Sequence, residues 1–126
     1  MSKLRTLFLA FLLLPLIDAV GQDPYGSIEG TIKDQQGAVV QNATVTVRNI
    51  ATNASRTAVT NDSGQYRILQ LQPGNYEVKV AATNFKQSIL ESVQVQVGQI
   101  AAADLNLEVG GASESVTVTP GSIAPD

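Results

Sequence analysis

Apolar and polar residues alternate with a period of two in seven separate segments between residues 25 and 109. In one of them, Val78 and Val80 alternate with Glu77 and Lys79. This alternation gives a strand one face for a core and one face for water. The segments fall at residues 28–33, 44–48, 56–60, 65–69, 76–82, 93–97 and 101–108. Seven short strands at this spacing predict an all-β protein, a sandwich or a barrel, and the polar 56–60 segment is expected at a sheet edge.

The same period predicts which side chains point inward. A slip of one residue would bury charged side chains such as Glu29, Arg67 and Lys79 in place of apolar ones. Two tyrosines fall on the apolar faces, and we expect each buried hydroxyl to find a hydrogen-bond partner. The expected core residues are Ile28, Ile32, Val45, Val47, Tyr66, Ile68, Tyr76, Val78, Val80, Val95 and Leu105.

Turn residues separate the segments. Gly, Pro, Asn and Asp cluster at 34–37, 61–64 and 73–74, and Gly98 follows the 93–97 segment. Asp34 and Asp62 lie in two of these turns. Calcium loops need several oxygen ligands at the D-x-D-x-D-G spacing, which is absent here. We therefore expect both carboxylates to accept hydrogen bonds from the turn backbone.

The first 21 residues have a different pattern. Lys3 and Arg5 precede an apolar run at 7–17, and Ala19 and Gly21 are small residues before a cut at Gln22. The run is shorter than the roughly 20 residues that span a bilayer. We interpret residues 1–21 as a signal peptide helix that is cleaved on export. An uncleaved anchor helix or a buried helix is the alternative.

The composition removes most catalytic chemistry. The chain has no His and no Cys, which excludes Ser-His-Asp and Cys-His nucleophiles, the usual zinc ligands and disulfides. Asp104 and Glu108 share a strand face, which we interpret as a solvated face rather than an acid–base pair. We expect no catalytic residue, no metal site and no cofactor, so the chain is not expected to be an enzyme.

Net charge limits the possible binding partners, and length limits the number of domains. Removal of the leader leaves six basic and ten acidic residues, a net charge of −4. An acidic chain without a basic patch is not expected to bind nucleic acid or an anionic membrane. About a hundred residues suit a single domain, placed here at 22–109. Residues 110–126 are expected to be a flexible C-terminal segment, although VTVT at 116–119 could form one last strand.

An ordered series of motifs runs over residues 25–107. It resembles the carboxypeptidase regulatory-like domain, a resemblance that implies a seven-stranded Greek-key sandwich of the prealbumin (transthyretin) type. Asn84 stands where that family usually has Gly, and Asn also tolerates left-handed backbone. The matching residues, in chain order, are Gly26, Gly30, Gly37, Val39, Val40, Ala43, Thr60, Asn61, Gly64, Tyr66, Leu71, Pro73, Gly74, Tyr76, Ala82 and Phe85.

The series is most similar to the copies found at the N-terminus of TonB-dependent outer-membrane receptors. In those receptors the sandwich follows a signal peptide and is followed by a segment like LNLEVGGASESVTVT, and then by a plug and a barrel. The resemblance implies a place in the periplasm or outer membrane of a Gram-negative bacterium, or secretion. It implies as partner either an envelope protein or the plug and barrel of such a receptor.

Three non-catalytic function classes remain open. The first is a structural or protein-interaction module, which would use an edge strand or the segment 111–119. The second is a carbohydrate-binding module, for which Tyr25 and Phe85 are the candidate ligand contacts because the chain has no Trp. The third is an adhesin stalk closed by a Lys–Asn bond, which Lys33 and Lys79 disfavour because both alternate to the polar face.

The leader yields the first prediction. Export should remove residues 1–21, because their charge, apolar length and small residues suit signal peptidase. N-terminal sequencing of the exported product should therefore begin at Gln22 or close to it. An intact Met1 on a cytoplasmic product would contradict the assignment.

Overall fold

A computed structural model describes residues 24–111 and 113–119 of the chain. The signal peptide helix expected at 1–21 lies outside these residues. The described part contains no helix long and apolar enough to cross a membrane. Its strands are β1 (Gly26–Asp34), β2 (Thr44–Asn49), β3 (Ser55–Val59), β4 (Gln65–Leu71), β5 (Gly74–Ala81), β6 (Gln87–Val95), β7 (Ile100–Ala102), β8 (Leu105–Leu107) and β9 (Ser115–Val118).

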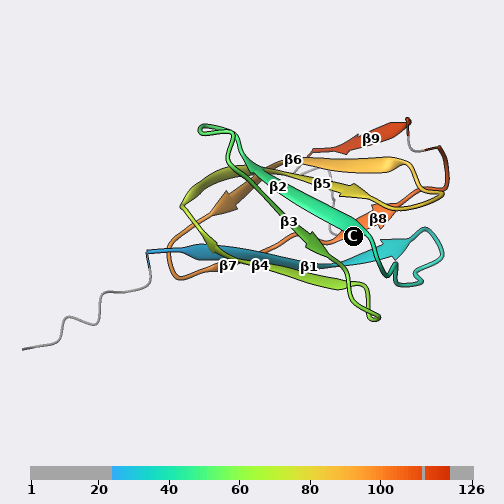
Figure 1. The fold of residues 1–126 in the computed structure, drawn as a ribbon, viewed down its shortest axis with the longest axis horizontal. Coiled ribbons are helices and arrows are strands. Elements are labelled where there is room, and N and C mark those ends of the chain that lie inside the picture. The colour runs from blue at the N-terminus through green and yellow to red at the C-terminus, as the bar shows by residue number, and fades with distance from the viewer. Residues whose placement is uncertain (1–23, 112, 120–126) are drawn as a thin grey trace, which may run out of the picture.

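The strands form two sheets that pack as a sandwich (Figure 1). In the first sheet, here the β1 sheet, β1 lies between β4 on one side and β7 and β8 on the other. The second sheet, here the β5 sheet, has the order β3-β2-β5-β6-β9. The all-β sandwich predicted from the sequence is confirmed, and β3, the polar 56–60 segment, is an edge strand as expected.

The core lies between the two sheets. Every residue expected to point inward is buried, and Ile28, Ile32, Val45, Val47, Val78 and Val80 have no exposed surface. Burial of a Val or Ile side chain contributes roughly 1.5–3 kcal/mol, so these six residues are a large part of the driving force. The strand register deduced from the period of two is confirmed.

The number of strands is nine in place of seven. One reason lies in the segment 101–108, where the pairing with β1 is broken between β7 and β8. Ala103 turns inward there and is buried. Its carbonyl lies so close to Gly30 that a Cβ on Gly30 would collide with it. The other reason is β9, described below.

The β6 strand is longer than predicted and carries a bulge. Val93 pairs with Tyr76 but Leu90 pairs with Val78, so that two residues of β6 oppose one residue of β5. A bulge of this kind shifts the inward phase by one residue. The period of two therefore fails across it, which hid residues 87–92 from the sequence pattern. Val97, expected in this strand, lies beyond its end and is exposed.

The sequence left open one last strand at VTVT within an otherwise flexible segment, and residues 115–118 do form a strand. They form β9, which pairs in parallel with Gln87–Leu90 of β6. Val118 packs against the core from this strand. Hydrophobic contact and ladder hydrogen bonds together order a segment that its glycines and serines made look loose.

Side-chain oxygens hold two of the turns, and the prediction for Asp34 is confirmed. Asp34 Oδ1 accepts hydrogen bonds from the backbone N–H groups of Gln36 and Ala38, at 2.9 and 3.0 Å. In the next turn the prediction for Asp62 is wrong, because Asn61 Oδ1 accepts the backbone hydrogen bonds from Ser63 and Gln65. Asn84 has a φ of 68°, the left-handed conformation expected of the residue that replaces the family's Gly.

The register yields the second prediction. Val78→Asp places an unpaired charge where the wild-type side chain has no exposed surface. We expect it to lower the free energy of unfolding by roughly 4 kcal/mol or more. Chemical denaturation measures the change. The control is Val59→Asp at a side chain that is 58% exposed, where the change should stay within about 0.5 kcal/mol.

Candidate functional site

The two aromatic residues expected to contact a ligand lie far apart. Tyr25 precedes β1, and its carbonyl accepts a hydrogen bond from Gly98, just beyond the end of β6. Phe85 lies just before β6 begins, where it bridges to Val109. The nine residues of β6 separate the two positions, a distance of roughly 25 Å at the rise of a strand. They do not form one aromatic platform.

Their exposure also differs. Tyr25 is 37% exposed, whereas Phe85 is half-buried and packs against the core. The geometry therefore leaves Tyr25 as the one ligand candidate of the pair that presents its ring to solvent.

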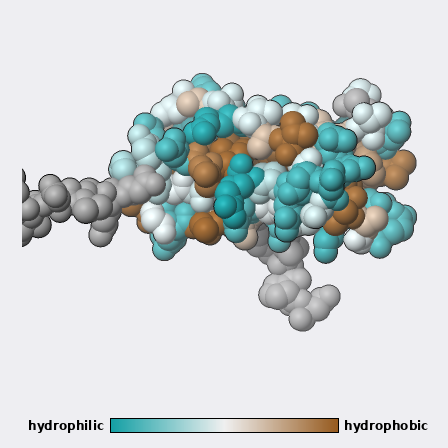
Figure 2. Space-filling model, turned by 60° about the horizontal axis from the view of Figure 1, so that its bottom comes forward, coloured by the Kyte–Doolittle hydropathy of each residue, from teal (hydrophilic) through white to brown (hydrophobic). Residues whose placement is uncertain are grey.

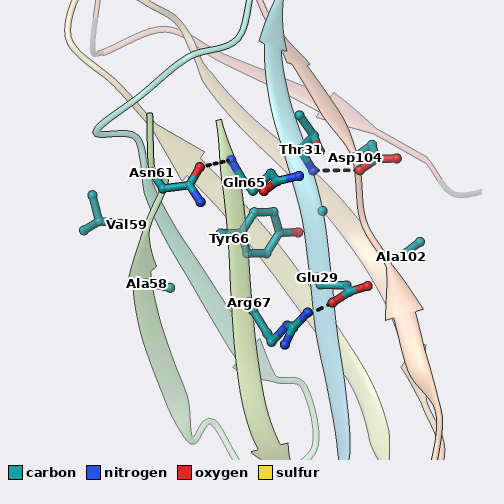
Figure 3. A pocket seen from close by; sticks show the side chains of 11 residues that line it. Glu29, Thr31, Ala58, Val59, Asn61, Gln65, Tyr66, Arg67, Ala102 and Asp104 are labelled. Atoms are coloured by element: carbon teal, nitrogen blue, oxygen red, sulfur yellow. Dashed lines mark hydrogen bonds and ion pairs between the residues drawn. The ribbon is translucent and has the colours of Figure 1, made fainter. Parts of the chain in front are cut away.

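A hollow lies elsewhere, on the outer face of the β1 sheet (Figure 3). Its volume is about 630 Å³, within the range of roughly 300–1,000 Å³ typical of small-molecule sites. Glu29 and Thr31 come from β1, and Arg67 and Gln65 are their partners across from them on β4. Ala58, Val59 and Asn61 lie at one side, and Ala102 and Asp104 at the other.

The side chain of Tyr66 crosses the sheet beneath this hollow. Tyr66 belongs to β4 and pairs with Gly30 of β1, yet its hydroxyl donates a 2.6 Å hydrogen bond to the Ala103 carbonyl on the far side of β1. The ring therefore lies between β4 and β1 and points toward β1 (Figure 3). Tyr76 also has a partner, the Gln72 carbonyl at 2.7 Å, so both expected hydroxyl contacts are confirmed.

Asp104 repairs the break between β7 and β8. Its Oδ1 accepts a 2.7 Å hydrogen bond from the backbone N–H of Thr31, which the missing strand backbone leaves without a partner. Burial, and next the negative charge of Asp104, raise the pKa of Tyr66 well above its ordinary value. This hydroxyl is therefore a permanent donor and no acid–base group at neutral pH.

Most carboxylates of the described residues are engaged in structural contacts, and Asp62 and Glu91 are the two that are not. Glu29 pairs with Arg67 at 3.0 Å, and Glu77 with Arg48 at 3.3 Å. Asp104 and Glu108, weighed as an acid–base pair, are bound separately, Asp104 to Thr31 and Glu108 to Lys86 at 3.8 Å. No group of three or more His, Cys, Asp or Glu side chains in this part of the chain could hold a metal ion.

Comparison with protein families assigns the chain. Residues 27–108 match the model of the carboxypeptidase regulatory-like domain, which is well over half of the chain. The protein belongs to this family, a regulatory and non-catalytic domain. None of the curated protein sequences matches the chain.

Solved structures share the fold at low identity. The Bacillus anthracis TIE protein is 23% identical with a TM-score of 0.59, over 68% of this chain and 17% of that one. A Bacteroides uniformis protein assigned to carbohydrate binding is 24% identical with a TM-score of 0.53, over 64% and 40%. GBS52, the minor pilin of Streptococcus agalactiae, is 10% identical with a TM-score of 0.56, over 72% and 47%.

These likenesses establish the fold and nothing more. The chain spans less than half the length of each of these three proteins. The same fold also occurs in a catechol 1,2-dioxygenase at 13% identity. One sandwich thus serves unrelated activities, and function must be argued from the surface of this chain.

The alternation of apolar and polar residues does not predict this hollow. The alternation did place Glu29 and Arg67 on the outer face, and no local signal pairs one strand with another. The lining residues come together because β1 pairs with β4 on one side and with β7 on the other, next to the break that precedes β8.

The third prediction concerns Tyr66. Tyr66→Phe leaves the buried Ala103 carbonyl without its donor, so unfolding free energy at pH 7 should fall by about 1–2 kcal/mol. Tyr25→Phe, at an exposed ring, is the control and should change little.

The same pair of proteins also tests the pH dependence. The folded pKa of Tyr66 lies above the unfolded value of about 10. Its contribution is therefore complete below pH 10 and is lost as pH rises further, because only the unfolded chain releases the proton. Between pH 10 and 11, the free energy of unfolding should therefore fall more for the wild type than for Tyr66→Phe. Parallel curves for the two proteins would contradict the assignment.

Proposed function

We propose that the chain is an exported, non-catalytic interaction module of the Gram-negative envelope, and that it makes contact through the open edge of β9. In this proposal it is the front module of a TonB-dependent receptor, which joins the plug and barrel to a further envelope protein. The family assignment supports the absence of catalysis. The observation that carries the interaction role is the character of the β9 edge.

The other sheet edges carry features that hinder pairing with a further chain. On β3, the Arg56 guanidinium donates to the Gln70 carbonyl at 3.1 Å. On β4, the register shifts, and Gln70 has a φ of 57°. The edge made by β7 and β8 is broken at Ala103 and Asp104. Charges, bulges and interruptions of this kind protect edges from unwanted pairing.

The β9 strand is short but has no such features. Its sequence, SVTV, contains no charge, Pro or Gly, and it pairs with β6 without a register shift. Val116 and Val118 are half-buried, and Val118 packs against the core, while Ser115 and Thr117 are exposed. An extended segment of another protein could add beside it as a sixth strand of the β5 sheet.

Lys86 holds the start of β9 in place. Its Nζ lies 3.8 Å from Glu108 Oε2 and 3.6 Å from Glu114 Oε2, so one ammonium joins both ends of the link between β8 and β9. The Gln87 N–H also donates to the Glu114 carbonyl at 2.8 Å. These contacts fix the direction of β9, and an oriented edge is a better template than a loose tail because less entropy is lost on binding.

The alternation of hydrogen bonds identifies the group that a partner would meet. In a parallel ladder, successive N–H groups of one strand point to opposite sides. The bond from Gln87 N–H to Glu114 directs the Val116 and Val118 N–H groups toward β6. The Thr117 N–H therefore points to the open edge.

The fourth prediction tests this edge in the bacterium that encodes the chain. A photo-crosslinking residue at Thr117 should capture one envelope protein, identified by mass spectrometry. Thr117→Pro, combined with a crosslinker at Ser115, should reduce capture at least tenfold, because it removes the outward donor at a position where an edge strand tolerates Pro.

Thr117→Ala keeps the N–H and is the matched control, which should capture as the wild type does. A crosslinker at Gln94, exposed on the same sheet, should capture nothing. Equal capture by Thr117→Pro, with a melting curve like that of the wild type, would overturn the proposal.

A further inference from the structure

The outer face of the β1 sheet carries two hollows, one with apolar residues near Tyr25 and one with polar residues near Thr31. This face comprises the side chains that alternate away from the core on β1, β4 and β7, together with Tyr25. Figure 2 turns this side of the molecule forward, and apolar surface lies there between polar areas. The distance from Tyr25 to Thr31 is roughly 20 Å at the rise of a strand.

The apolar end surrounds a smaller hollow of about 310 Å³. Tyr25, Leu69 and Ile100 line it and are 37%, 52% and 62% exposed. The side chains of Gln70 and Gln99 lie beside them. An exposed aromatic ring with aliphatic neighbours and amides suits a ligand that has apolar faces and polar edges.

The polar end is the hollow of Figure 3, where several hydrogen-bonding groups are unused. Arg67 Nε donates to Glu29, and no contact within the described residues engages its terminal nitrogens. The same holds for the Gln65 side chain. The Asn61 side chain makes hydrogen bonds only through its oxygen, and the Asp104 carboxylate through only one of its two oxygens. Donors and acceptors are thus mixed within one hollow.

Charge and backbone pairing limit the chemical classes of ligand that this face could bind. Glu29 neutralises Arg67, and only the Asp104 carboxylate remains, so the hollow does not favour an anion. The β1 strand is paired on both sides, so this face offers no backbone ladder to a peptide. What remains is recognition by side-chain amides, carboxylates and one guanidinium, which suits a ligand rich in hydroxyl groups.

We infer that this face is a binding site for an uncharged oligosaccharide. One sugar ring stacks on Tyr25 between Leu69 and Ile100, and the following units place their hydroxyls on Arg67, Gln65 and Asp104. The inference goes beyond the proposed function, because it uses the outer face of the β1 sheet and makes no use of β9.

The fifth prediction is tested by NMR. The full ¹⁵N-labelled chain is titrated separately with maltotetraose, cellotetraose and xylotetraose up to 20 mM. At least one should shift backbone signals of residues 25–31, 65–70 and 99–104. Tyr25→Ala and Gln65→Ala should each weaken that binding at least fivefold, through loss of the platform and of the amide.

Gln94→Ala removes an exposed glutamine from the other sheet and is the matched control, which should bind as the wild type does. The spectra themselves report whether each variant is folded. The inference is overturned if none of the three sugars binds, if the shifts lie on another face, or if folded Tyr25→Ala and Gln65→Ala bind normally. None of these results bears on the β9 edge.

Discussion

The arrangement of the β1 sheet depends on the close approach of the Ala103 carbonyl to Gly30. Only a residue without a Cβ allows it, and the approach lets the chain leave the sheet after β7 and return as β8. The Tyr66 hydroxyl then satisfies the carbonyl, and the Asp104 carboxylate satisfies the Thr31 N–H. A break in a central ladder would otherwise leave buried backbone groups unpaired, at a cost of about 1–3 kcal/mol each. The missing side chain of Gly30, the Tyr66 hydroxyl and the Asp104 carboxylate therefore act together to allow the break.

Most of the fold could be predicted because the period of two is a local property. Val45 and Val47, or Val78 and Val80, each signal the buried face without reference to any other strand. The failures occur where strand pairing is interrupted. The bulge after Leu90 shifts the phase of β6, and the break at Ala103 divides a run whose alternation continues unchanged from Ala101 to Leu107. Neither the bulge nor the break alters the local composition enough to be recognised in the sequence.

The site was less predictable, for a related reason. Exposure of Tyr25 follows from its place before the first strand, but the half-burial of Phe85 depends on its bridge to Val109, a contact that only the tertiary structure provides. The hollow requires the pairing of Glu29 with Arg67 and the return of the chain at Asp104. Such proximity is a product of sheet topology, which no spacing in one sequence encodes. The β propensity of VTVT is compatible with a last strand, and its pairing with β6 is what forms β9.

The two proposed surfaces belong to different sheets and have different physical requirements. The β9 edge offers backbone groups in a fixed direction, so its affinity would depend little on the partner's side chains, and its specificity would come from the link held by Lys86. The outer face of the β1 sheet offers only side chains, because β1 is already paired on both sides. Its affinity would therefore be low for each contact and would require a ligand that repeats along the strand. A module without His, Cys or a metal cluster in its described part can still hold a partner at one sheet while the other remains accessible, since the core between the sheets keeps their geometries independent.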